Sequence, residues 1–345
     1  MKKFMIAVAA GSTLALAAAA HAQQKVRINL ANAFPNNLTL IGEAPGKLAQ
    51  KLNRLSAGTL ELRVNEPGAL VPALQAIQAT GQGSVDAAWS NAGFFAGTDS
   101  AFNMFAAVPF GPGIPEYLAW VHHGGGLQLS REMFGKHGVH NIPCAIIPPE
   151  ASGWFRKEIK TLDDLKGLKM RFFGLGANVM QNLGVSTQLL QAGEIFQALQ
   201  LGTIDATEFS MPVMDLSLGF HQVAKFYYFP GWHQQATFGD LIINKAKWDA
   251  FSPHQKAAIQ GACDQTILKG VSAGETLQGP AIDELVKKGV QLKTWPPEFL
   301  AAFEREWKKV AEEQAAKSPE FKKAWDSLSK FRAEYKLWGD RGYLK

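Results

Sequence analysis

The chain has 345 residues, a formal net charge of +5 at pH 7 and a hydrophobic content of 47%. This length exceeds one ordinary domain, so two lobes are expected, and this composition excludes a disordered chain. Lysine and arginine are scattered among acidic residues, without a basic tract or an aromatic ladder, which argues against nucleic-acid binding.

Residues 1–22 have the order of a secretory signal peptide. Lys2 and Lys3 form a basic start, residues 4–20 carry no charge, and residues 20–22 (Ala-His-Ala) form a cleavage site of the small-x-small type. We therefore expect cleavage after Ala22 and secretion of a soluble protein. The alternative is an uncleaved membrane anchor, for which this apolar run is marginal because a bilayer span needs roughly 20 residues.

The pattern that follows predicts a parallel sheet with helices packed on it. Polar and apolar residues alternate over 25–30 and 59–64, and a third short strand is expected at 84–89. Apolar residues recur at helical spacing over 41–55 and 72–80. This β-α-β-α-β order is typical of α/β proteins, whose parallel strands are joined by helical crossovers.

A second α/β unit is expected over about 150–230, after a helix at 115–134 and a buried strand at 138–147. The run Thr-Leu-Asp-Asp-Leu at 161–165 predicts a capped helical turn. The unit then alternates strands and helices. The expected strands are 168–172, 186–190 and 204–209, and the expected helices are 177–183 and 194–200.

The last part of the chain is mainly helical. A strand at 238–244 is expected to return to the first sheet. Helical patterns follow over 253–288, interrupted by glycines and Pro280, and over 297–335. The chain is expected to cross between the lobes near 145–150 and again near 230–238.

Cys144 and Cys263 are the only cysteines, one in an expected strand and one in an expected helix. Outside the cytoplasm such a pair can form a disulfide. Because the two lie far apart in unlike contexts, we expect two buried free thiols, with the disulfide as the alternative. Neither belongs to a Cys-x-x-Cys or Cys/His cluster, which argues against metal ligation.

Two segments match motifs of serine hydrolases, namely His-Gly-Gly-Gly at 123–126 and Gly-Val-Ser-Ala-Gly at 270–274. The second motif needs a strand directly before Ser272, whereas 255–269 has a helical pattern. It also needs a histidine after Ser272, whereas the last histidine of the chain is His254. We therefore interpret the chain as a non-enzyme and keep a secreted serine hydrolase as the alternative of another class.

Two further tests argue against a cofactor held by a local motif. The loop at 174–179 resembles a dinucleotide-binding loop but has Val179 in place of the third glycine. The eight histidines show no spacing typical of a metal site. No organic cofactor is expected.

Charged residues gather at the expected carboxyl ends of strands in the second unit. Arg171 ends one strand, Glu208 ends another, and Glu150 lies at a crossing between the lobes. Small ligands bind to α/β proteins at such strand ends. A guanidinium grips a carboxylate through two parallel hydrogen bonds, and two carboxylates beside it would suit a hard cation. A surface or salt-bridged arginine, and an ordinary salt bridge for each acid, are the alternatives.

Aromatic residues crowd the same segments. Most are expected in the core, and one or two are expected to wall a ligand. The candidate ligand contacts beside Arg171 and Glu150 are Asn91, Trp154, Phe173, Phe209 and Trp232.

Four motifs in one order carry a resemblance to a known family. They are GWFRKEI at 153–159, DLKGLKMR at 164–171, GTIDATE at 202–208 with Pro212 and Asp215 after it, and YYFPGWH at 227–233. Over 25–340 the chain resembles the periplasmic substrate-binding subunits of TRAP (tripartite ATP-independent periplasmic) transporters. It is most similar to those that bind 2-oxo acids such as pyruvate, or lactate, together with a metal ion.

The resemblance implies a site and a task. Arg171 would pair with the carboxylate of a small organic acid. Glu208 and the main chain of Phe209 would coordinate Ca²⁺ or Na⁺, with Glu150 as a further candidate ligand. The protein would work in the periplasm, close on the acid and dock on TRAP membrane subunits.

The resemblance also implies a two-lobed fold like that of other periplasmic binding proteins, with a hinge, a long helix between the lobes and C-terminal helices. Residues 1–22 are assigned to the signal peptide and 148–234 to lobe II. Lobe I takes 23–147 with about 235–265. The spanning helix and the C-terminal helices take about 253–345 and pack on both lobes.

Four positions depart from the 2-oxo-acid binders. Glu150 stands where they have glutamine, Phe209 where they have tryptophan, and Ser210-Met211 where they have Val-Gly. The extra carboxylate favours Ca²⁺ over Na⁺ or, without a metal, accepts a ligand hydroxyl or amine. The alternative ligand is an aromatic carboxylate or a sulfonate bound without metal, and a sensor for a signalling receptor would share the same site.

Overall fold

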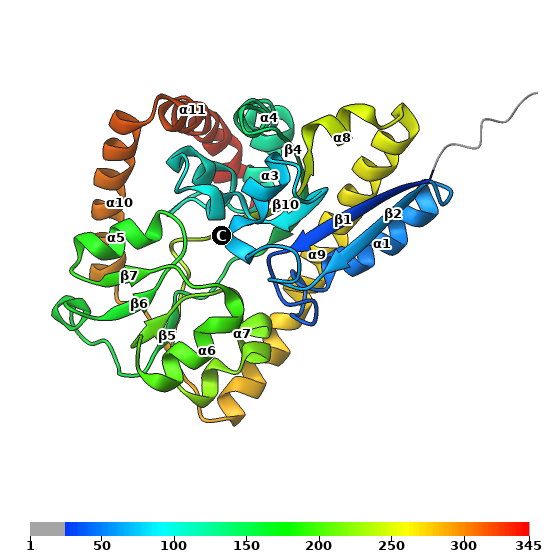
Figure 1. The fold of residues 1–345 in the computed structure, drawn as a ribbon. Helices are drawn as coiled ribbons and strands as arrows, with labels where there is room; N and C mark the ends of the chain where they lie inside the picture. Colours follow the sequence, from blue (N-terminus) through cyan, green and yellow to red (C-terminus); the bar gives the residue numbers. More distant parts are fainter. Residues whose placement is uncertain (1–24, 345) are drawn as a thin grey trace, which may run out of the picture.

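The computed structural model describes residues 25–344, so the expected signal peptide lies outside the described residues. Two β-sheets organise this part of the chain (Figure 1). The first has the strand order β2-β1-β3-β10-β4, and the second has the order β11-β9-β5-β8-β6-β7. We call the parts built on these sheets lobe I and lobe II. The strands are β1 (Val26–Asn32), β2 (Leu60–Asn65), β3 (Ala87–Ser90), β4 (Val139–Ile147), β5 (Gly153–Phe155), β6 (Lys169–Arg171), β7 (Ser186–Gln188), β8 (Ala206–Thr207), β9 (Phe226–Phe229), β10 (Thr237–Asn244) and β11 (Gln291–Thr294).

Helices cover both sheets (Figure 1). The α-helices are α1 (Ala44–Leu55), α2 (Ala76–Gly81), α3 (Ile114–His123), α4 (Gly126–Lys136), α5 (Gly176–Asn182), α6 (Ala192–Leu201), α7 (Pro212–Leu218), α8 (Lys245–Ala250), α9 (Pro253–Lys287), α10 (Pro297–Lys317) and α11 (Pro319–Gly342). The 3₁₀ helices are η1 (Ala73–Gln75), η2 (Ala92–Phe95), η3 (Ser100–Phe105), η4 (Leu162–Leu165) and η5 (Phe220–Gln222). No helix among the described residues has the length and apolar character that crossing a membrane requires.

Lobe I has the parallel arrangement that the sequence predicts. β1 pairs in parallel with both β2 and β3, so that Leu30 lies opposite Val64 and Ala87. The predicted return strand, β10, lies antiparallel between β3 and β4. It is buried along almost its whole length, as expected for a central strand covered on both faces.

Lobe II is built on shorter strands. β6 pairs in parallel with β7 and β8, whereas β5 runs antiparallel to β8 and β9. The strands β5, β9 and β11 were not predicted from the sequence. β11 joins this sheet beside β9 after the chain has passed along α9.

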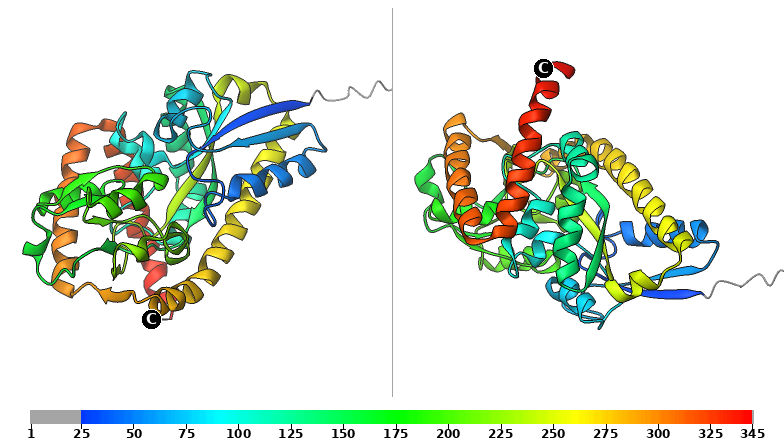
Figure 2. Two further views of the ribbon diagram at one scale, coloured as in Figure 1. Left: turned by 60° about the horizontal axis from the view of Figure 1, so that its bottom comes forward. Right: turned by 90° about the horizontal axis from the view of Figure 1, so that it is seen from above.

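The helix α9 is one continuous element of 35 residues that runs past both lobes (Figure 2). Ser252 accepts a hydrogen bond from the main-chain N–H of Gln255 at its start. The expected interruptions do not end the helix, although Pro280 lies inside it. A proline inside a helix costs about 3 kcal/mol. Packing offsets this cost, because α9 contacts β4 and α1 in lobe I and α7 in lobe II.

Cys144 in β4 and Cys263 in α9 form a disulfide, so the expectation of two free thiols is wrong. The reason is packing at long range, since α9 lies directly on β4 and brings the two Cα atoms to 4.3 Å. Both residues are fully buried. The disulfide fastens the first half of the long helix to lobe I.

Two expected helices are broken by local chemistry that helical spacing does not reveal. The helix expected at 115–134 is two, α3 and α4, because Gly125 has a φ of +90°, in the left-handed region that favours glycine. The helix expected at 297–335 is likewise two, α10 and α11. Ser318 lies between them and accepts a hydrogen bond from the N–H of Phe321, which starts the second helix.

Candidate functional site

Arg171 lies at the carboxyl end of β6, and its side chain is only 2% exposed. Its Nε donates to the carbonyl of Leu190 at 3.2 Å. Its Nη1 donates to the carbonyl of Glu208 at 2.9 Å and to Oε1 of the same residue at 2.8 Å. These bonds offset the cost of removing the guanidinium from water and hold the side chain in one orientation.

Glu208 follows β8 and is fully buried. Its Oε1 also accepts a hydrogen bond from the main-chain N–H of Phe173, whereas its Oε2 has no hydrogen-bond partner. Burial opposes ionisation, but Arg171, His233 and the Phe173 amide together hold the pKa of the Glu208 carboxyl below its ordinary value. Glu208 is therefore a carboxylate whose Oε1 is hydrogen-bonded and whose Oε2 has no hydrogen-bond partner.

Glu150 lies where the chain leaves β4 for lobe II, and it is buried as well. Ser210 Oγ donates to its Oε1 at 3.1 Å, and Gln234 Nε2 donates to its Oε2 at 2.8 Å. Burial, followed by the charges of Glu208 and Asp215, raises the pKa of this carboxyl well above its ordinary value. The two carboxyls therefore share one region of low polarity, which favours a positive charge between them.

His233 completes a cluster with these two acids. Its Nε2 lies 3.7 Å from Glu208 Oε2 and 3.9 Å from Glu150 Oε2. One donor atom of each residue lies within 4.8 Å of the others, and all three side chains are buried. Both ring nitrogens of His233 lack a hydrogen-bond partner, as does Glu208 Oε2. Unpartnered buried polar atoms cost about 1–3 kcal/mol each, so the cluster fits a bound cation.

His233 is not predicted by the spacing of histidines along the chain. The acids come from positions 150 and 208, so no local motif unites the three residues. One signal was present, since His233 closes the motif at 227–233 and lies at the predicted second crossing between the lobes. The first crossing holds Glu150, and two crossings of one hinge lie side by side.

A cavity of about 370 Å³ lies beside this cluster, with walls from both lobes. Arg171 and Glu150 form its charged part. The ring of Phe209 lies against the guanidinium of Arg171, whose Cζ is 5.4 Å from the ring centroid. The other lining residues are Phe34, Ile41, Asn91, Phe94, Ile147, Phe173, Ser210, Met214, Gln234 and Thr237.

Five of the seven predicted ligand contacts therefore line the cavity, and two do not. Trp154 stacks on Tyr227 at 3.9 Å between ring centroids and donates from Nε1 to Asp215 at 2.9 Å. Trp232 packs against Phe303 in the core, with 4.8 Å between ring centroids. Both tryptophans are buried and neither lines the cavity, which corrects their expected role as cavity walls.

The two lobes touch at one edge of the cavity. Phe94 of lobe I meets Phe173 of lobe II edge to face, with 5.2 Å between ring centroids. A Cβ atom placed on Gly93 would lie 2.2 Å from Cζ of Phe173, far inside contact distance. The absence of a side chain at Gly93 therefore allows lobe I to approach Phe173 this closely.

Comparison with known proteins identifies the family to which this fold belongs. The family described as "Bacterial extracellular solute-binding protein, family 7" (DctP) matches residues 31–318 of this chain. A monocarboxylate 2-oxoacid-binding periplasmic protein of Nostoc is 32% identical over 314 residues, which cover 91% of this chain and 86% of the relative.

Two solved structures of TRAP transporter solute-binding proteins share the fold. One, from Bordetella bronchiseptica with calcium and picolinate, has a TM-score of 0.89 and 31% identity and covers 91% of this chain and 94% of that one. Another, from Pseudoalteromonas atlantica with sodium and pyruvate, has a TM-score of 0.87 and 29% identity and covers 92% of this chain and 98% of that one. The chain thus belongs to the DctP family, the solute-binding proteins of TRAP transporters.

Proposed function

We propose that the protein is a periplasmic receptor that captures a small 2-oxo or 2-hydroxy monocarboxylate for a TRAP transporter. The observation that carries the proposal is the position of Arg171, buried at the wall of a cavity between two lobes and beside a cluster that fits a cation. A guanidinium in such a place recognises a carboxylate. The relative from Nostoc is named for monocarboxylate 2-oxo acids, and the relative from Pseudoalteromonas atlantica was crystallised with pyruvate.

Residues of both crossings would hold the cation. The proposed ligands are the side chains of Glu150, Glu208 and His233, with the main chain of Phe209. A bound Ca²⁺ or Na⁺ would supply the positive charge that the carboxylate and the 2-oxygen of the acid can both approach. Glu150 adds a second carboxylate to the set, which favours the divalent ion.

The rest of the molecule suits a receptor that closes. A ligand that touches both lobes favours the closed arrangement of a hinged protein, and the closed form would dock on the TRAP membrane subunits. A serine hydrolase is not supported, because Ser272 lies inside α9 and its hydroxyl donates to the carbonyl of Leu268 at 2.8 Å. A nucleophile in that class stands on a strand-to-helix turn.

A second ligand class has a specific observation in its favour. Phe34, Phe94, Phe173 and Phe209 all line the cavity. Together these rings would enclose an aromatic carboxylate, and the relative from Bordetella bronchiseptica holds picolinate. Picolinate and benzoate therefore belong in the same ligand screen as pyruvate and lactate.

Thermal shift followed by calorimetry tests both proposals. Pyruvate with Ca²⁺ should raise the melting temperature, because a ligand that binds only the folded protein stabilises it by mass action. A chelator should remove most of this gain in melting temperature. Glu150→Gln should weaken the binding of Ca²⁺ more than the binding of Na⁺. An unchanged thermal shift after chelation would contradict the proposed metal site. The absence of a shift with every monocarboxylate would contradict the proposal that the protein binds such acids.

A further inference from the structure

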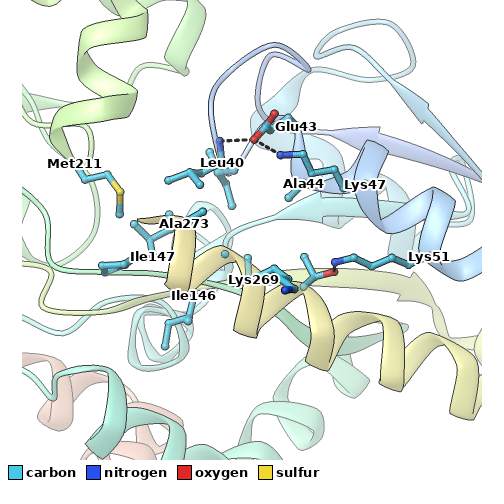
Figure 3. A pocket seen from close by; sticks show the side chains of 15 residues that line it. Leu40, Glu43, Ala44, Lys47, Lys51, Ile146, Ile147, Met211, Lys269 and Ala273 are labelled. Atoms are coloured by element: carbon cyan, nitrogen blue, oxygen red, sulfur yellow. Dashed lines mark hydrogen bonds and ion pairs between the residues drawn. The ribbon is translucent and has the colours of Figure 1, made fainter. Parts of the chain in front are cut away.

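A second pocket, of about 570 Å³, lies beside α9 (Figure 3). Leu40 and α1 of lobe I form one side, the end of β4 and α9 form the floor, and Met211 of lobe II closes the far end. Ile41 and Ile147 line both this pocket and the acid cavity, so these two side chains stand between the two spaces. We call this space the hinge pocket.

The hinge pocket is apolar at one end and positive at the other. Figure 3 places Ile147 and Met211 on one side and the lysines Lys51 and Lys269 on the other. Lys51 donates from Nζ to Thr266 Oγ1 at 3.0 Å. Among the described residues, no carboxylate forms an ion pair with Lys51 or Lys269, in contrast to Lys47, which pairs with Glu43. Glu43 also lines the pocket but is paired with Lys47, so Lys51 and Lys269 face a largely apolar pocket without an ion-pair partner of their own.

This combination selects one chemical class. The lysines exclude a cation, and the apolar walls, which include Leu40, Ile146 and Ala273, disfavour a small, fully hydrated anion. We propose that the hinge pocket binds an amphipathic monocarboxylate, with its carboxylate between Lys51 and Lys269 and its hydrocarbon chain toward Ile147 and Met211. The ammonium groups would gain charge-assisted hydrogen bonds, and the chain would leave water.

The position of the hinge pocket couples it to the acid cavity. Ile147 and Pro148 belong to the segment by which the chain passes from lobe I to lobe II, and a Cβ on Gly274 of α9 would lie 2.8 Å from Pro148. Met211 comes from lobe II directly before α7, and Gln278 of α9 donates to its sulfur at 2.9 Å. Because walls of one pocket come from both lobes, its shape depends on their relative position. Occupancy of either site therefore changes the affinity of the other, and the coupling is reciprocal.

Octanoate is the probe for the test. Calorimetry should show octanoate binding both to the protein alone and to the protein with pyruvate and Ca²⁺, and NMR of methionines labelled with ¹³C at the methyl group should show a shift of Met211. The double substitution Lys51→Met with Lys269→Met should lower the affinity for octanoate about tenfold or more, which is the loss expected for charge-assisted hydrogen bonds. Lys287→Met, near the end of the same helix in an exposed pair with Asp283, is the matched control and should change nothing.

The outcomes separate this proposal from the proposed function. Octanoate that competes with pyruvate, or that leaves Met211 unshifted, overturns the hinge pocket as its site. Ala273→Phe, which fills the pocket, should abolish octanoate binding and leave pyruvate binding measurable. Saturating octanoate should change the dissociation constant of pyruvate about fivefold or more, and an unchanged constant overturns the coupling. Failure of pyruvate to bind at all contradicts the proposed function alone, because octanoate binding is measured directly.

Discussion

The two lobes contribute different chemistry to one cavity. Lobe II supplies the charge, with Arg171 at the end of one short strand and Glu208 at the end of another. Lobe I supplies Phe34 and Phe94 as an apolar wall, with Asn91 as a polar neighbour. The side chain of Asn91 is already occupied within lobe I, donating to the carbonyl of Phe238 and accepting from the N–H of Gly93.

This difference suggests how the site works. The lobe with the buried charges would hold the acid, and the apolar lobe would close over it and exclude water, which strengthens each charge interaction. Apart from the short β3, strands of six to nine residues build lobe I, whereas strands of two to four residues build the lobe that carries the charges. The following predictions test this division of work, beginning with the largest expected effect.

Loss of the charge in lobe II should have the greatest effect. Arg171→Met leaves Glu208 buried without its cation, which costs about 3–5 kcal/mol in the free energy of unfolding. Calorimetry should show pyruvate affinity falling at least about 100-fold, since a buried charged contact is lost. Arg171→Lys, which keeps the charge but not the planar fork, is the control and should retain part of the affinity. Wild-type affinity in a folded Arg171→Met protein would refute the site.

Loss of the disulfide should weaken lobe I and spare the acid cavity. Cys144→Ala with Cys263→Ala is expected to lower the free energy of unfolding by about 2–4 kcal/mol, measured by urea denaturation. Hydrogen exchange should rise first in β4 and in the part of α9 that contacts it. The dissociation constant of pyruvate at 25 °C should stay within about twofold. Faster exchange confined to lobe II would show that α9 is fastened elsewhere.

Gly93→Ala should hinder the approach of the lobes without removing any charge. The added methyl group meets Phe173 at 2.2 Å, and such overpacking costs about 1–3 kcal/mol. We expect affinity for pyruvate to fall about tenfold and small-angle scattering to show a more open protein with ligand. Gly97→Ala is the matched control because nothing lies within 4 Å of its added Cβ. Equal effects of both substitutions would mean that the contact with Phe173 does not limit closure.

The smallest effect concerns a buried acid in lobe I. Burial raises the pKa of Asp240 to about 7, although Asn141 donates to its carboxyl. Between about pH 4 and pH 7 the native state keeps a proton that the unfolded chain has released, so this residue makes stability fall as pH rises.

Asp240→Asn should remove that slope and stabilise the protein by about 1 kcal/mol or more above pH 7. Denaturation at a series of pH values measures this, with the exposed Asp163→Asn as control. Because Asp240 lies in lobe I, away from the cavity, pyruvate affinity should not change. An unaltered pH profile of stability would show that Asp240 is ionised in the native protein.

Local patterns predicted much of this protein. Alternation predicted β1 and β2, the run at 238–244 predicted β10, and the Thr161 capping box predicted the turn at η4. Strand ends predicted the positions of Arg171 and Glu208, because a parallel sheet places the carboxyl ends of its strands at one edge. Four motifs predicted the family, and the comparisons confirm it.

Only the tertiary structure decided how distant parts meet. It paired Cys144 with Cys263, placed His233 beside Glu150 and Glu208, and kept the buried Trp154 and Trp232 out of the cavity lining. The sequence by itself determined which residues carry charge and where many of the strands and helices begin, since periodicity and caps are properties of neighbouring residues. Contacts between β4, α9 and the two crossings depend on how whole elements pack, and no local pattern encodes that packing.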